Sequence, residues 1–489
     1  MTSWFDVTTS INWNRPPVGI VRTEVEVIKA SLKRDDSAYF RITQKGPVQV
    51  PSEQVAQHMR NLSQPKRDLP KEDKVHTRRS AFPRSLNDLR MLAMQRVSTL
   101  SPAQRMLFMR CALPLNAIFD FIIQFRPFVA GVKRHLKAQL DNESVQYRAT
   151  TKSEKPRNLV REFLTDNDLK SCEENCQWRI FAEGDIVFSA GLLWDYMDFT
   201  RLNKEKHNHK FLFANVCYDL IPVKFPQFVP DKFPDKFLEY AANLLWTSDH
   251  FFCISKTTES DLQDFAKELG FPKELSTSIV TLGDEVAKES LPIKQIEDLG
   301  KDIILYVSTI ERRKNHELIL SVLEELNYPS GENLPIVVFV GMAGWHVDEL
   351  FRDIALNPKL KFPDGTSAVK ILNNVSDQNL KWLYEKSLFS VFPSFYEGWG
   401  LPVGESLIHG TPVIASDRGS LLEASQGRAA HIHPKDLITW ARLIGEYIRE
   451  PEKLNEAREQ ARKYKPREWS DFGLQVIDTL QTRRKSESK

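Results

Sequence analysis

Short apolar runs alternate with amphipathic segments from about residue 300 onward. Runs such as Ile303–Val307 and Ile336–Val340 are apolar throughout, which predicts strands buried on both faces of a parallel sheet. The segment between them, 316–326, carries apolar residues at helical spacing. The same rhythm predicts strands at 369–372, 388–392 and 413–415, and helices at 377–386, 403–408, 437–448 and 452–463. This part of the chain is therefore predicted to form a doubly wound α/β domain.

The first 290 residues show the same alternation near their two ends. Strands are predicted at 5–7, 185–189, 211–216 and 251–254, and helices at 22–32 and 257–269. Ser255 is placed to cap the second of these helices. We therefore expect a first domain at 1–290 and a second at 296–465, with a polar linker at 288–302.

Residues 46–175 do not follow this rhythm. Segment 60–84 is rich in Lys, Arg and Pro and predicts a loop, whereas 86–140 reads as helices that carry apolar and basic residues together. We interpret 46–175 as a helical, basic insertion in the first domain. It could rest on an anionic membrane surface. The alternative is a helical cap that covers part of the first sheet.

Composition limits the function classes. A chain of 489 residues is too long to fold around a single hydrophobic core and is expected to form two or three domains. Its formal net charge of +2 gives no reason to expect nucleic acid as a partner. Five cysteines in so long a chain argue against a secreted disulfide scaffold, and the pair Cys172 and Cys176 lacks further metal ligands nearby. With no signal-like start and no apolar run of about 20 residues, a cytoplasmic protein is predicted.

The strongest chemical signal is the sequence FPSFYEGWGLPVGE, which contains Glu397 and Glu405. It falls between a predicted strand and helix, at the sheet edge where open α/β proteins bind ligands. Gly398 and Gly400 let the backbone approach a ligand closely, and the helix N-terminus suits a diphosphate. Both carboxylates could accept hydrogen bonds from the same ligand.

This segment resembles the E-x7-E region of the retaining glycosyltransferases of family 4, which have the GT-B fold. The resemblance continues through 410–416 and Leu422-Glu423, and backward through 308–315 and 341–345, so it covers essentially all of 300–450. It is similar to the subgroup of bacterial mannosyl- and rhamnosyltransferases of polysaccharide assembly. The resemblance implies two facing Rossmann-like domains, with residues 466–489 forming a terminal helix that crosses back to the first domain and a polar tail.

The resemblance also implies roles for single residues. Glu397 would contact the hydroxyls of the donor sugar, and Glu405 the ribose. Lys314, helped by Arg313, would neutralise the departing diphosphate, which is the main catalytic task. The remaining donor contacts would come from the backbone around Gly398, Trp399, Gly400 and Leu401, from Gly19 and from Gly341.

The first domain matches less of the family pattern. Gly19-Ile20-Val21-Arg22 is similar to the subgroup's Gly-Ile-x-Arg loop, and Tyr218-Asp219-Leu220-Ile221-Pro222 resembles a His-Asp-Leu-Ile-Pro segment at the cleft wall. Gly19 would approach the donor phosphates, and Arg22, Tyr218 and Asp219 would line the acceptor side. For Gly19 the alternative is an ordinary turn, and for Asp219 it is a loop-capping role.

Three positions depart from the family: Thr309 and Met342 stand where a cation is frequent, and Tyr218 replaces the histidine. The predicted function is transfer of a mannose- or rhamnose-like sugar from a nucleotide diphosphate donor to a glycan or lipid-linked glycan. No metal or other cofactor is expected, and the enzyme could lie peripherally at the inner face of the plasma membrane. The alternatives are a non-catalytic scaffold and a nucleotide-sugar epimerase on the same fold.

Overall fold

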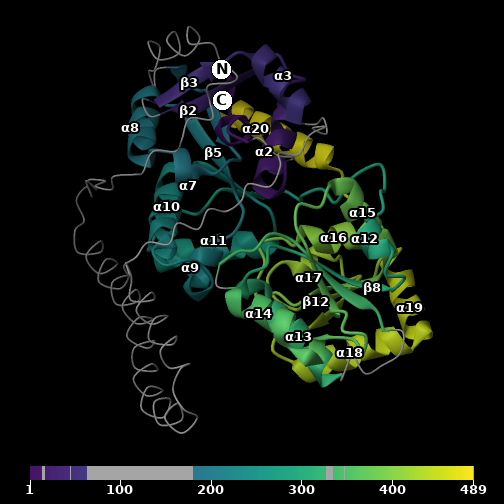
Figure 1. Ribbon diagram of the computed structural model, residues 1–489. Helices are drawn as coiled ribbons and strands as arrows, with labels where there is room; N and C mark the ends of the chain where they lie inside the picture. The colour runs from purple at the N-terminus through teal and green to yellow at the C-terminus, as the bar shows by residue number, and fades with distance from the viewer. Residues whose placement is uncertain (14–16, 44–45, 63–179, 327–333, 346, 488–489) are drawn as a thin grey trace, which may run out of the picture. The chain divides into compact units, whose positions relative to one another are not determined.

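The computed structural model describes residues 1–13, 17–43, 46–62, 180–326, 334–345 and 347–487. By their contacts, residues 1–63 and 157–489 form one compact unit, to which all the described residues belong. Within this unit the described strands form two sheets, one of seven strands and one of six (Figure 1).

The first sheet has the strand order β3-β2-β1-β4-β5-β6-β7. Its strands are parallel except β3, which pairs antiparallel with β2 at one edge. Buried aromatic residues such as Phe5, Phe188 and Phe252 form its core, with ring centroids 5.6 to 5.9 Å apart. The strands are β1 (Ser3–Asp6), β2 (Ser37–Thr43), β3 (Gly46–Val50), β4 (Ile186–Ser189), β5 (Leu212–Cys217), β6 (His250–Cys253) and β7 (Thr277–Ile279). The helices are α1 (Thr8–Ile11), α2 (Gly19–Ser31), α3 (Ser52–Leu62), α7 (Leu193–Tyr196), α8 (Phe199–His209), α9 (Ile221–Lys224), η3 (Pro226–Phe228), α10 (Phe233–Thr247) and α11 (Lys256–Glu268).

The predicted start of the insertion at residue 46 is wrong. Gly46–Val50 forms the edge strand β3, and Ser52–Leu62 forms α3, whose buried Val55 and Met59 join the core. The basic, Pro-rich stretch that follows made this short strand and helix look like part of one irregular region. The rest of the predicted insertion, and with it the predicted membrane contact, lies outside the described residues. None of the helices in the described ranges is both long and apolar enough to span a bilayer.

The second sheet is entirely parallel, in the order β10-β9-β8-β11-β12-β13. As predicted, the inner strands Ile303–Val307 and Ile336–Val340 are apolar throughout, which is typical of a parallel sheet covered on both faces. The strands are β8 (Ile303–Val307), β9 (Ile336–Val340), β10 (Val369–Leu372), β11 (Ser387–Phe392), β12 (Val413–Ser416) and β13 (Ala430–Ile432). The helical segments are α12 (Lys294–Glu297), η4 (Arg312–Lys314), α13 (His316–Glu325), α14 (Asp348–Leu356), η6 (Pro358–Leu360), α15 (Asp377–Lys386), α16 (Leu401–Ile408), α17 (Leu421–Ala424), α18 (Leu437–Arg449) and α19 (Pro451–Ala461).

The last helix, α20 (Trp469–Glu487), returns to the first sheet and packs along α2 (Figure 1). A side chain at Gly473 would lie 2.7 Å from the carbonyl oxygen of Glu26, so glycine permits this close approach. The Gln475 side chain donates to the carbonyl of Ile279 in β7 at 3.0 Å. The chain thus passes between the two sheets twice.

Candidate active site

Two loops meet at the carboxyl edge of the second sheet. The turn η4 follows β8, and the glycine-containing turn at 393–400 follows β11. Because β8 and β11 pair in parallel, both loops leave the sheet at the same edge. The amide of Phe395 donates to the carbonyl of Arg313 at 2.9 Å, which joins the two loops directly.

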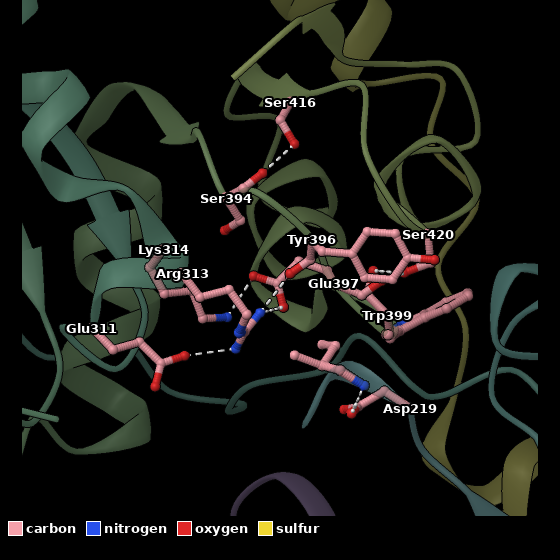
Figure 2. Close-up of polar contacts among 12 residues, drawn as sticks. Asp219, Glu311, Arg313, Lys314, Ser394, Tyr396, Glu397, Trp399, Ser416 and Ser420 are labelled. Carbon is pink, nitrogen blue, oxygen red and sulfur yellow. Dashed lines mark hydrogen bonds and ion pairs between the residues drawn. The ribbon is translucent and has the colours of Figure 1, made fainter. Parts of the chain in front are cut away.

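Glu397 lies between two cations from η4 (Figure 2). Lys314 Nζ is 2.5 Å from Glu397 Oε1, and Arg313 Nη1 is 2.9 Å from Oε2. Arg313 Nη1 also donates to the carbonyl of Tyr396 at 2.6 Å, and its Nη2 binds Glu311 at 2.7 Å. Two carboxylates and two cations therefore form one nearly buried network.

The charges of this network decide which groups are ionised. Burial would raise the pKa of Glu397, but Arg313 and Lys314 outweigh it and lower that pKa to about 2. Burial would lower the pKa of Arg313, but Glu397 and Glu311 raise it overall. Burial and the neighbouring Arg313 lower the pKa of Lys314, although Glu397 opposes them. Glu397 is thus ionised throughout the physiological pH range.

The backbone of the turn is held in place by the loop after β12. A Cβ at Gly419 would lie 2.4 Å from the carbonyl oxygen of Glu397, so only glycine fits there. The amide and hydroxyl of Ser420 both donate to that carbonyl at 3.1 Å. Gly400 has φ +102° and directly precedes α16 as its N-cap residue. The amides of residues 398–401 donate no hydrogen bond to any atom of the described chain, so they are available to an anion.

Glu405 has different surroundings on α16. The Tyr384 hydroxyl donates to Glu405 Oε2 at 2.8 Å. Burial raises the pKa of Glu405 to about 7, although the Tyr384 hydrogen bond and the charge of Arg22 oppose the rise. Arg22 comes from α2.

Comparison with known proteins supports this reading of the second sheet. Residues 287–464 match the family model described as glycosyl transferases group 1. This segment is a group 1 glycosyltransferase domain. A serotype-specific mannosyltransferase, WbdA, from Escherichia coli is 28% identical over 246 residues, which are 48% of this chain and 29% of that protein. The O-antigen chain mannosyltransferase B from the same organism is 31% identical over 150 residues, which are 30% of this chain and 38% of that protein.

The Anabaena protein HepE, in complex with UDP, superposes with a TM-score of 0.47 at 15% identity, over 61% of this chain and 79% of that chain. The predicted fold class is confirmed: the chain is an α/β protein with the two Rossmann-like sheets of the GT-B fold. The helical insertion in that prediction lies outside the described residues.

The first sheet contacts the glycosyltransferase domain at Gly398. A Cβ there would lie 2.5 Å from the carbonyl oxygen of Tyr218 and 2.8 Å from Asp219 Cβ. The hydroxyls of Ser255 and Thr258 donate to the Gly398 carbonyl at 2.9 and 3.3 Å. Glycine at this position is therefore required by close packing between segments from the two sheets.

Asp219 and Tyr218 differ in what their side chains do. The Asp219 carboxylate accepts from the amide of Ile221 at 3.0 Å and so caps the turn that follows it in the chain. This is the loop-capping role that the sequence offered as the alternative. Burial raises the pKa of Asp219, while the charge of Arg313 opposes the rise. The Tyr218 hydroxyl donates to the carbonyl of Ala190 at 2.5 Å, within the first sheet.

The other predicted residues have separate surroundings. Gly19 begins α2 with φ +51°, and a Cβ there would meet no atom within 4 Å. Gly341 serves backbone packing, since a Cβ would lie 1.8 Å from the Ser308 carbonyl oxygen. Trp399 is buried, and the Arg467 guanidinium lies 4.8 Å from its ring centroid. Arg22 lies over the Trp469 ring at 4.8 Å.

Sequence reasoning missed several residues that hold the site. Glu311 binds Arg313, and its position beside three successive cations could have suggested this. Glu423 was noted as part of the motif without a role; it accepts from the amides of Lys256 and Thr257 at 2.8 and 2.9 Å, at the start of α11. Pairing between segments so distant in sequence leaves no local signal.

Proposed function

We propose that this protein is a retaining glycosyltransferase that moves mannose from a nucleotide diphosphate donor to a glycan or lipid-linked glycan in polysaccharide assembly. The observation that carries the proposal is the contact of Glu397 with Lys314 and Arg313 at the sheet edge of the matched domain. Mannose is favoured because relatives that are 28% and 31% identical are mannosyltransferases. The chain spans less than two-fifths of those relatives.

The cations would carry the chemistry. Cleavage of the glycosidic bond leaves negative charge on the diphosphate, and preorganised cations and amides stabilise that charge best. Lys314, Arg313 and the amides of 398–401 are such groups. They would supply the charge stabilisation that a divalent metal can supply elsewhere, so the proposed reaction needs no metal.

Glu397 would hold the donor sugar. An ionised carboxylate is a strong acceptor for hydroxyl groups, and its pKa of about 2 keeps Glu397 ionised. In the proposed reaction the acceptor hydroxyl approaches the face of the sugar from which the diphosphate leaves. Its proton passes to a phosphate oxygen of the leaving group, so the new bond keeps the donor's configuration and no protein base is needed.

The decisive experiment compares wild type with Glu397→Gln. Thermal-shift screening against GDP-, UDP- and dTDP-sugars first identifies the donor, because a bound ligand raises apparent stability. Transfer to a glycan acceptor is then measured, and the anomeric configuration of the product is read by NMR. We expect Glu397→Gln to lower the transfer rate by at least about 100-fold, whereas Glu459→Gln on the exposed face of α19 leaves it unchanged.

Other results would redirect the proposal. If Glu397→Gln transferred sugar at the wild-type rate, Glu397 would not be needed for the reaction and the proposal would fail at its central residue. Nucleotide-sugar binding without transfer to any acceptor would favour a scaffold, and conversion of labelled donor without acceptor would favour an epimerase. An inverted product would overturn the retaining outcome alone.

A further inference from the structure

Tyr384 is a buried side chain of α15 whose hydroxyl contacts Glu405. Its side chain is 0% exposed, and the hydroxyl donates to Glu405 Oε2 at 2.8 Å. Its carbonyl accepts from the Thr411 hydroxyl at 2.6 Å, and its ring stacks on His409 at 5.6 Å. Tyr384 is therefore fixed by its backbone, by its ring and by its hydroxyl.

His409 completes the arrangement from the far end of α16. Its Nδ1 lies 2.7 Å from the carbonyl oxygen of Glu405, and its ring is nearly parallel to that of Tyr384, at 15°. His409 thus contacts the backbone of Glu405, and Tyr384, on which His409 stacks, contacts the carboxylate. Oε1 of Glu405 receives no hydrogen bond from the described part of the chain, so it is available to a ligand.

A buried hydroxyl is costly unless it has a partner, and here its partner is a carboxylate that belongs to the candidate site. A packing role alone would be filled equally well by phenylalanine. The hydroxyl instead selects one rotamer of Glu405 and one of its two oxygens. Such support shells determine how precisely a binding group is aimed.

We propose that Tyr384 is a positioning residue for nucleotide binding: its hydroxyl orients the Glu405 carboxylate toward the ribose hydroxyls of the donor. This inference rests on the proposed function, because it assumes that a nucleoside diphosphate occupies the site. It adds a residue to the nucleotide side of the site, on α15 and not on the two loops that hold Glu397.

Several charged groups face Glu405 and act on its protonation. Arg22 from α2 favours the ionised carboxylate, whereas Asp377 from α15 and Asp284 from the segment after β7 disfavour it. The Tyr384 hydrogen bond also favours the ionised form and so lowers the pKa that burial raises. Tyr384→Phe should therefore weaken ribose binding most near neutral pH, where it shifts Glu405 toward the protonated form.

The test measures binding of GDP, UDP, ADP and dTDP by calorimetry and takes the tightest ribonucleotide forward, beside its 2′,3′-dideoxy analogue. We expect Tyr384→Phe to weaken the ribonucleotide about 5-fold and to leave the dideoxy analogue unchanged. The midpoint of the pH dependence should also move upward. Since the terminal phosphate of the nucleotide titrates near pH 6 itself, variants are compared at each pH with the same nucleotide.

Two controls separate positioning from damage. Tyr447→Phe removes a hydroxyl from a largely buried tyrosine of α18, whose ring packs against Phe389 at 5.4 Å, and should change neither affinity. In a Glu405→Gln background, Tyr384→Phe should no longer move the pH midpoint. Equal weakening of both nucleotides, or of neither, overturns the role of Tyr384 while leaving the proposed function intact. If wild type binds none of the four nucleotides, the proposed function itself fails and this inference with it.

Discussion

Glu397 and Glu405 belong to one short motif, yet the two regions around them differ in charge. The Glu397 region contains Arg313 and Lys314, at 2.9 and 2.5 Å from its carboxylate. The Glu405 region supplies a neutral hydroxyl, that of Tyr384. Burial raises the pKa of both glutamates, but cations reverse the effect only at Glu397, so the pKa values are about 2 and about 7. The neighbours, more than the motif, set the charge of each carboxylate.

This difference separates two tasks within the site. A permanently ionised Glu397 keeps two cations in a fixed geometry at all physiological pH values. Glu405 changes its protonation near neutrality, so the strength of its hydrogen bonds depends on pH. Sugar positioning should therefore be insensitive to pH, whereas nucleotide affinity should rise as the pH increases through about 7.

The largest expected effect is on acid stability at Glu397. Its folded pKa of about 2 lies below the ordinary value of 4.5, so its ionised form stabilises the fold above pH 4.5, and this contribution is lost as pH falls through 2. Glu397→Gln should lower the free energy of unfolding by about 3 kcal/mol at pH 7, with the difference shrinking toward pH 2. Urea unfolding of both proteins between pH 2 and 7 measures it.

The matched control for this series is Glu459→Gln, which removes an exposed carboxylate on α19. It should stay within about 0.5 kcal/mol of wild type at each pH. A Glu397→Gln difference that does not vary with pH would mean that Lys314 and Arg313 do not hold an ionised carboxylate in the folded protein.

A smaller effect of opposite sign on the free energy of unfolding is expected at Glu405. Its folded pKa of about 7 lies above 4.5, so its contribution to stability is full below pH 4.5 and is lost as pH rises through 7. Relative to wild type, Glu405→Gln should therefore gain stability between pH 4.5 and 8. Partial exposure of the side chain reduces the gain to about 1–2 kcal/mol. The same urea unfolding series, extended to pH 8, measures this gain. If the free energies of unfolding of the two variants changed with pH in the same way, the two glutamates would not differ in charge as proposed.

The sequence predicted strands β8 to β12 of the second sheet to within one residue at each end, because β8 and β9 are continuously apolar and the helices between them are periodic, whereas α14 was not predicted. It also indicated the motif from Glu397 to Glu405 and the two cations of η4. It could not indicate Tyr384 as the partner of Glu405 or Glu423 as the partner of the amides of Lys256 and Thr257. Those pairings depend on rotamers and on packing between elements. The edge strand β3 was missed because its short apolar run adjoins a long basic segment.

The smallest effect concerns the cations that the site lacks. Glu397 and Glu311 offset part of the charge of Arg313 and Lys314, so the diphosphate would meet less net positive charge there than two unpaired cations would provide. Met342 is 53% exposed. Its carbonyl accepts from the amide of Ile310 at 2.9 Å, and Ile310 lies in the segment that leads into η4. A lysine at this position can extend into solvent near the same sheet edge without disturbing the core.

Met342→Lys should therefore tighten nucleoside diphosphate binding by about 2- to 5-fold, which corresponds to roughly 0.5–1 kcal/mol for an exposed charge. The gain should fall as salt is raised from 0.05 to 0.5 M, since salt screens exposed charges over about 10 Å or less. Leu356→Lys is the matched control: Leu356 is 69% exposed at the end of α14, where the chain returns to the opposite edge of the sheet. Equal gains for the two lysines would indicate a general effect of net charge. A gain only at Met342 would show that nucleotide binding by the Glu397 region is limited by its supply of positive charge.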